Sequence, residues 1–188
     1  AFVLAKIKPT DPEVHKALVQ ALVDNHNSLA MQKAAFVLAK IKPTDPEVHK
    51  ALAQALLHNH NSLVRKLAAS VLGQIKPTDP EIHRAFIKAL VDENSSVRQE
   101  AANALRNITL TDKIFTMTSE AIPEFYKNIF KASSDRDFSI VKIVHEILRL
   151  IKPTNKEGLD EIANLLQDED MRISFKAHQF LKKINSAE

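Results

Sequence analysis

The stretch Ile41-Lys42-Pro43-Thr44-Asp45-Pro46-Glu47 recurs along the chain and decides its fold. The same seven residues stand at 7–13 and at 75–81, and a shortened copy, Ile-Lys-Pro-Thr-Asn, stands at 151–155. The first three copies are 34 residues apart. A fixed period of about 20–50 residues is typical of an array of stacked structural repeats. We therefore expect the chain to repeat one supersecondary unit.

The first half of this stretch ends a helix. Pro43 cannot continue a helix that runs into Ile41, because proline has no N–H and its ring clashes with the preceding turn. Proline also moves the residue before it, Lys42, away from helical geometry. Each copy of the stretch therefore predicts the end of one helix.

The second half of the stretch starts the next helix. Thr44 or Asp45 offers a side-chain oxygen to the free N–H groups of the first helical turn, and the sequence leaves both residues open as the cap. Pro46 fits the first turn, where its missing N–H costs nothing. Glu47 completes a Thr-x-x-Glu capping box and suits the positive end of the helix dipole.

The composition suits packed helices. Two Gly residues among 188, with 45% hydrophobic residues, leave little material for tight β-turns. Cys is absent, which removes disulfides and thiolate metal sites and fits a reducing compartment, so we expect a cytoplasmic protein. The sequence contains no run of about 18 apolar residues, so we expect no transmembrane helix and no membrane partner. The net charge of +3 does not by itself indicate a nucleic-acid binder.

The chain divides into repeats of one kind. Residues 1–7 match 35–41, so the sequence starts within a repeat and we interpret it as a fragment, natural or engineered. Residues 1–34 and 35–68 differ at only seven positions, which indicates recent duplication or design. The expected divisions are a partial repeat at 1–7, regular repeats at 8–41, 42–75 and 76–108, an atypical repeat with an insertion at 109–151, and a capping repeat at 152–188. The apolar residues of 1–7 are expected to fray or to support end-to-end self-association.

Each regular repeat is expected to be a helical hairpin. The segment 12–23 carries the apolar stripe of an amphipathic helix, and a polar turn with Ser28 as the cap follows it. A second helix is expected from Leu29 to Ile41. In the atypical repeat, Leu110 stands where the regular repeats have proline, and we expect helices at about 119–131 and 138–150.

The second helices carry a family resemblance. The pattern Val-Arg-x-x-Ala-Ala-x-x-Leu-x-x-Ile, found at 64–75 and 97–108 after an Asp/Asn-rich turn, resembles the second helix of a HEAT repeat. The resemblance covers nearly the whole chain. It implies an all-α fold, a right-handed α-α superhelix with the second helices on the concave side. The first unit departs from the pattern with Ala30-Met31 in place of Val-Arg, and His58 replaces the turn aspartate of the second unit.

No catalytic constellation is present in the sequence. The repeated Glu-x-His motifs at 13–15, 47–49 and 81–83 place histidines at least one interhelical distance apart, so we expect capping and surface roles rather than metal binding. A family of HEAT-like iron hydroxylases has several His-Glu pairs, but only His145-Glu146 exists here, so no di-iron site is expected. Gly-rich phosphate loops and nucleophile elbows are also absent. We expect no enzyme activity and no cofactor.

The remaining candidate is a surface. The face of the second helices opposite the core stripe can be read from the helical period. Its candidate partner-binding residues are Gln32, Phe36, Lys66, Ser70, Gln99, Asn103, Arg106, Lys142, His145, Glu146, Arg149, His178, Gln179 and Lys182.

This face becomes more basic towards the C-terminus. These polar and basic residues are explained either by a functional groove or by a helix face that is simply exposed to solvent. We predict a non-catalytic scaffold that binds a protein or peptide partner, an acidic one included, through the concave face. Nucleic-acid binding by the same face and a purely structural or designed spacer remain alternatives.

Overall fold

The computed structural model describes residues 10–24, 26–111, 122–150 and 156–185. These residues form helices and contain no strand, which confirms the all-α class. The helices are α2 (Pro12–Val23), α3 (Ser28–Ile41), α4 (Pro46–His58), α5 (Ser62–Ile75), α6 (Pro80–Ala89), α7 (Ser95–Thr111), α8 (Ile122–Ala132), α9 (Phe138–Leu150), α10 (Lys156–Asn164), the 3-10 turn η2 (Leu165–Gln167) and α11 (Met171–Asn185).

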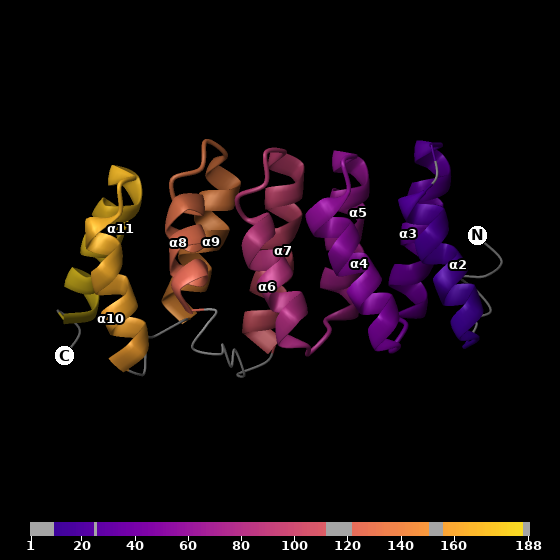
Figure 1. Cartoon of the computed structure of the whole chain (residues 1–188), viewed down its shortest axis with the longest axis horizontal. Coiled ribbons are helices and arrows are strands. Elements are labelled where there is room, and N and C mark those ends of the chain that lie inside the picture. The colour runs from indigo at the N-terminus through magenta and orange to yellow at the C-terminus, as the bar shows by residue number, and fades with distance from the viewer. Residues whose placement is uncertain (1–9, 25, 112–121, 151–155, 186–188) are drawn as a thin grey trace.

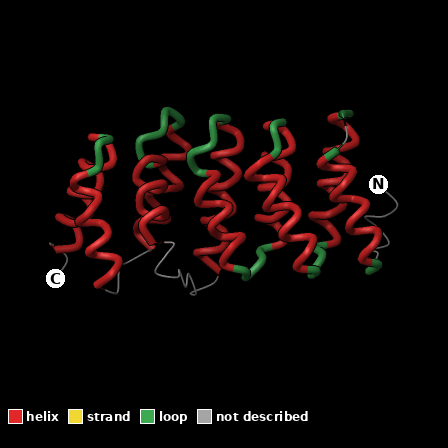
Figure 2. Tube along the Cα trace, in the orientation of Figure 1, coloured by secondary structure: helices red, strands yellow, loops and turns green. Residues whose placement is uncertain are grey.

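The helices pair into hairpins that stack as a solenoid. Figure 1 shows the hairpins following one another along the long axis, from α2 and α3 at one end to α10 and α11 at the other. The turns inside the hairpins lie along one edge of the array, and the connections between hairpins lie along the opposite edge (Figure 2). The partial repeat expected at 1–7, and with it the expected self-association, lies outside the described residues.

The repeated stretch connects the hairpins, and its capping residue is Asp45. The Asp45 side chain accepts a hydrogen bond from the backbone N–H of Glu47 at 2.9 Å, and Pro46 is the first helical residue. The equivalent aspartates cap α2 and α6 in the same way. The expected capping box is wrong, because Thr44 lies one residue before the cap. Glu47 instead accepts from Lys50 at 3.1 Å, one helical turn later.

Lys42 and Lys76, each directly before a proline, leave the helix in the left-handed region. Lys42 has φ 53° and ψ 64°, and Lys76 has φ 57° and ψ 60°. Their backbone N–H groups donate to the carbonyl oxygens of Leu38 and Leu72 at 2.9 Å. The predicted departure of Lys42 from helical geometry is confirmed. A non-glycine residue in this region carries strain of about 1–2 kcal/mol.

The repeated histidines are not at the surface, and that part of the prediction is wrong. His15 and His83 are buried and His49 is half-buried. The Nε2 atom of His83 lies 2.9 Å from the carbonyl oxygen of Pro77, and His49 makes the same contact to Pro43 at 2.7 Å. Since a carbonyl oxygen only accepts, Nε2 carries the proton and donates. Each ring therefore fastens the start of one helix to the connection before it.

Two helix ends differ from the sequence-based expectation. Asn27, not Ser28, caps α3, and its side-chain oxygen accepts from the N–H groups of Leu29 and Ala30 at 2.9 and 3.3 Å. The helix α7 continues past Ile108 to Thr111. The regular repeats stop their second helices with a proline, and Leu110 at the corresponding position permits helix to continue.

One core runs through the array, and the second helices form its tighter layer. Leu22, Leu56 and Leu90, at equivalent positions of three repeats, are at most 1% exposed. The helices α3, α5, α7 and α9 pack more closely on one another than α2, α4, α6 and α8 do. A Cβ atom on Gly73 of α5 would lie 2.9 Å from the Cβ of Ala104 in α7, so this approach requires glycine. We infer that the second helices occupy the inner side of the curved array.

Candidate partner-binding face

The residues that the sequence predicts for partner binding all belong to second helices. Seven of them are exposed: Gln32, Phe36, Lys142, His145, His178, Gln179 and Lys182. Six are half-buried: Lys66, Ser70, Gln99, Asn103, Arg106 and Glu146. Arg149 belongs to α9, and its side chain lies outside the described part of the structure. We call this set the second-helix face; its role in binding remains a prediction.

Some of these side chains bond to one another or to the next helix. Nη1 of Arg106 in α7 lies 3.7 Å from Oε2 of Glu146 in α9. Gln99 donates to the hydroxyl of Ser139 at 3.2 Å, again from α7 to α9. The positive charge of Arg106 is therefore compensated within the chain, whereas Lys142 and Lys182 form no ion pair with described residues.

Exposed aromatic side chains stand towards the two ends of the second-helix row. Phe36 of α3 is 51% exposed, and Nζ of Lys40 lies 5.7 Å from its ring centroid. Phe175 of α11 is 57% exposed. Large aromatic side chains next to cations are common anchors at protein interfaces. Phe175 belongs to the same helix as the predicted residues His178 and Lys182.

An arginine, buried in one repeat and half-buried in the next, joins each of two repeats to the following turn, a feature that the sequence analysis missed. Arg65 of α5 is only 6% exposed. It donates from Nε and Nη2 to the two carboxylate oxygens of Asp92 at 2.8 and 2.9 Å. Its Nη1 donates to the carbonyl oxygens of Asn59 and His60 at 2.9 and 3.2 Å. The guanidinium thus closes its own hairpin turn and holds the next one.

Arg98 repeats this arrangement one unit later. It donates to the carboxylate of Asp135 at 2.5 and 3.2 Å, and to the carbonyl oxygens of Asp92 and Glu93. Burial acts to raise the pKa of Asp135. The hydrogen bonds from Arg98 and from the N–H of Asp137 outweigh burial and hold that pKa below its usual range.

The first junction lacks both partners of this pair. Met31, 2% exposed, stands at the arginine position, and His58 stands at the aspartate position of the next turn. The sequence showed both departures separately. The structure shows that Met31 and His58 occupy the two positions that an ion pair joins one repeat later, where Arg65 reaches Asp92 in the next turn. We call this series of contacts the arginine ladder.

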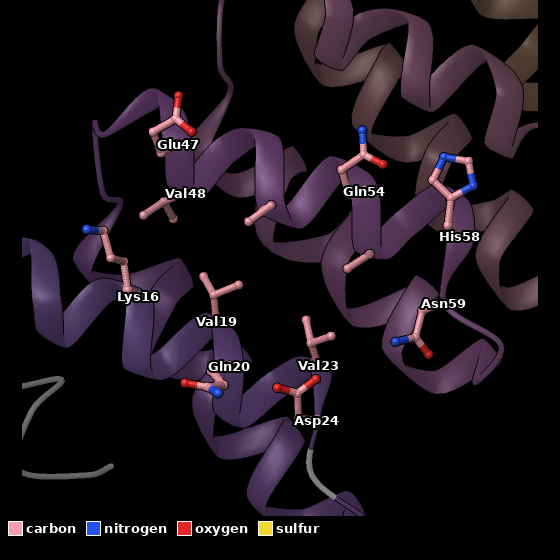
Figure 3. A pocket seen from close by; sticks show the side chains of 12 residues that line it. Lys16, Val19, Gln20, Val23, Asp24, Glu47, Val48, Gln54, His58 and Asn59 are labelled. Atoms are coloured by element: carbon pink, nitrogen blue, oxygen red, sulfur yellow. The ribbon is translucent and has the colours of Figure 1, made fainter.

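A cleft lies in the outer layer, between α2 and α4, and holds none of the predicted residues. Figure 3 shows Val19, Val23 and Val48 pointing into it, with polar side chains around the rim. Its volume of about 640 Å³ is within the usual range of ligand pockets, ~300–1,000 Å³. Lys16 at its rim is bonded to Glu13 at 3.0 Å. The wider spacing of the first helices accounts for the cleft.

A smaller cavity brings two predicted residues together. His145 of α9 and Gln179 of α11 both line a space of about 210 Å³ between α8, α9 and α11. The other lining residues are Phe130, Ser133, Leu148, Lys176, Phe180 and Lys183. Over the described ranges, no three His, Asp or Glu side chains are arranged to hold a metal ion.

Comparison with known proteins supports the repeat type. A family described as HEAT repeats matches residues 50–129. No match was found among curated proteins. In the described residues, no helix is long and apolar enough to cross a bilayer.

Solved structures share the fold at low sequence identity. An engineered protein is 24% identical, with a TM-score of 0.51 over 97% of this chain and 87% of that one. A designed armadillo repeat protein in complex with the peptide (KR)4 is 18% identical, with a TM-score of 0.52 over 88% and 79%. A chain in the complex of CpcE and CpcF of phycocyanin lyase from Nostoc sp. PCC7120 is 19% identical, with a TM-score of 0.55 over 91% of this chain and 99% of that one. The predicted helical repeat solenoid is confirmed.

Proposed function

We propose that this solenoid of HEAT-type repeats is a non-catalytic scaffold that binds a protein or peptide partner through its second-helix face. One observation carries the proposal. The side of the five second helices away from the core carries polar, basic and aromatic side chains that are exposed on α3, α9 and α11 and half-buried on α5 and α7, whereas the opposite side is buried. Extended surfaces of this kind are what repeat arrays use to bind partners.

The charge of the face favours an acidic partner. Lys66, Lys142 and Lys182 contribute positive charge, and Glu146, the predicted acidic residue, is paired with Arg106. The designed armadillo protein of the same fold holds a basic peptide, (KR)4. The second-helix face here has the opposite charge preference, so an acidic peptide or an acidic protein surface is its complement.

Nucleic acid is the competing partner for a basic face. Arg106 shares its charge with Glu146, so three lysines remain as phosphate contacts among the described side chains of the face. Three contacts correspond to a slope of log K against log salt of about −2.7 on duplex DNA, typical of weak non-specific binding. We therefore favour a protein partner.

Affinity capture with matched variants tests the proposal. The bait is the whole chain, and the captured proteins are identified by mass spectrometry. Lys142→Glu with Lys182→Glu reverses charge on the second-helix face, and Lys16→Glu with Lys50→Glu makes the same change on the first helices. The proposal expects a captured acidic protein to be lost with the first pair and retained with the second. Equal retention by both pairs, or tight DNA binding that only the first pair abolishes, would overturn it.

A further inference from the structure

The row of second helices changes its packing before the last hairpin. The pairs α3–α5, α5–α7 and α7–α9 pack directly, but over the described residues α11 packs mainly on α8, α10 and η2 rather than on α9. Aromatic rings hold α11 there: the Phe180 ring lies 5.7 Å from that of Phe130 and 6.4 Å from that of Tyr126, centroid to centroid. A space between α9 and α11 follows from this arrangement.

Lys176 stands at a position that is apolar on the neighbouring second helix. The turns before α9 and α11 align through Asp135 and Asp168, an offset of 33 residues. At this offset Lys176 of α11 corresponds to Ile143 of α9, which is buried. A lysine at this position keeps its ammonium group in water and cannot fill a core as isoleucine does.

The 210 Å³ cavity occupies this space, and its lining has two chemical parts. Phe130, Leu148 and Phe180 provide apolar surface. Lys176, Lys183 and His145 provide basic groups, and no carboxylate is among the lining residues. Lys176 forms no ion pair with any described residue. The cavity therefore combines an apolar interior with a rim that attracts anions.

We propose that this cavity is an anchor pocket for an acidic peptide, taking one apolar side chain while Lys176 at its rim binds a neighbouring carboxylate. The inference rests on the proposed function and specifies the class of partner. The volume is below the ~300–1,000 Å³ of pockets for drug-sized ligands, which suits a single side chain rather than a cofactor. Lysine–carboxylate hydrogen bonds are charge-assisted and add orientation to the apolar contact.

The position of the pocket agrees with the second-helix face. His145 and Gln179 belong both to that face and to the cavity lining. A peptide that crosses the face can therefore place a side chain into the cavity without leaving the face. Central apolar anchors with a polar rim are the usual source of affinity in such interfaces.

Fluorescence anisotropy with a labelled nonapeptide tests the pocket. The probe has one central phenylalanine flanked by aspartates, and two control peptides replace the phenylalanine by serine or the aspartates by asparagine. Lys176→Glu is compared with Lys50→Glu, which makes the same charge change on the first helix α4, away from the second-helix face. Gln179→Trp, which fills the mouth, is compared with Gln54→Trp on α4. Far-UV circular dichroism checks that each variant is folded.

The proposal expects Lys176→Glu and Gln179→Trp to weaken binding by at least about tenfold, the scale of one lost charge-assisted contact. Lys50→Glu and Gln54→Trp should change it less than about threefold, and both control peptides should bind weakly. Equal losses for Lys176→Glu and Lys50→Glu would overturn the pocket. Absence of any binding would also overturn the pocket, and the capture experiment then judges the proposed function separately.

Discussion

Replacing Arg65 by methionine should show how much the arginine ladder contributes to stability. The Arg65 side chain is nearly inaccessible and makes hydrogen bonds to the Asp92 carboxylate, to Glu93 and to two backbone carbonyls. Methionine fits such a position, because Met31 occupies the equivalent one and is buried. The variant leaves the Asp92 carboxylate without its guanidinium. Removing one partner of a buried ion pair costs about 3–5 kcal/mol, and we expect Arg65→Met to lower the free energy of unfolding by that amount.

The second half of the experiment changes Asp92 to histidine. The double variant Arg65→Met with Asp92→His reproduces the pair found at the first junction, Met31 with His58. The unpaired carboxylate is then gone. We expect the double variant to be more stable than Arg65→Met alone, with a favourable coupling energy of at least about 1 kcal/mol, as for residues in direct contact.

Urea unfolding followed by circular dichroism gives the free energies, and hydrogen exchange locates the loss. Because repeat arrays can unfold in parts, slowly exchanging amides in α5, α6 and α7 should lose protection first in Arg65→Met. A cost below about 0.5 kcal/mol, which is usual for exposed sites, would refute the reasoning. Strict additivity of the two substitutions would refute it as well.

Three further predictions concern stability. Leu56→Ala should cost about 2–5 kcal/mol in urea unfolding, because Leu56 is 1% exposed between the helices; a loss below about 0.5 kcal/mol contradicts the packing described. Lys42→Gly should raise the free energy of unfolding by up to about 1 kcal/mol, because glycine relieves the left-handed strain but adds freedom to the unfolded chain. A clear loss of stability in thermal unfolding would contradict strain at this residue. Hydrogen bonds from Arg172 lower the pKa of Asp170 to about 2, below the unfolded value of about 3.9. The ionised Asp170 therefore stabilises the folded chain above pH ~4, and this stabilisation is lost as pH falls towards ~2. The variant Asp170→Asn keeps a capping oxygen and should lessen the loss of stability at low pH. An unchanged dependence of stability on pH would contradict this prediction.

The local rules of the sequence predicted the hairpins well. Proline is excluded from the interior of a helix beyond its first turn, so Pro43 marks a boundary without any knowledge of packing. The continuation of α7 follows from the same rule, because Leu110 lacks the block. The sequence could not choose between Asp45 and Thr44 as the cap, because both side chains can cap a helix and the choice depends on the backbone geometry.

Contacts between repeats were beyond these rules. Arg65 and Asp92 are 27 residues apart, and only the stacking brings them together. The signal in the sequence was the joint change to Met31 and His58, which is meaningful only when one repeat's helix is known to meet the next repeat's turn. The cavity beside Lys176 has the same origin, since it exists because α11 leans on α8. The burial of His83 depends on the carbonyl oxygen of Pro77, which accepts the hydrogen bond from Nε2–H of the ring.

Hydrogen exchange of the chain with and without a captured acidic partner tests the central claim, binding by the second-helix face, most directly. The account predicts that the partner slows exchange in α5, α7, α9 and α11, most strongly in α9 and α11, and leaves α2, α4 and α6 unchanged. Slower exchange confined to the first helices, around the outer cleft between α2 and α4, would contradict it.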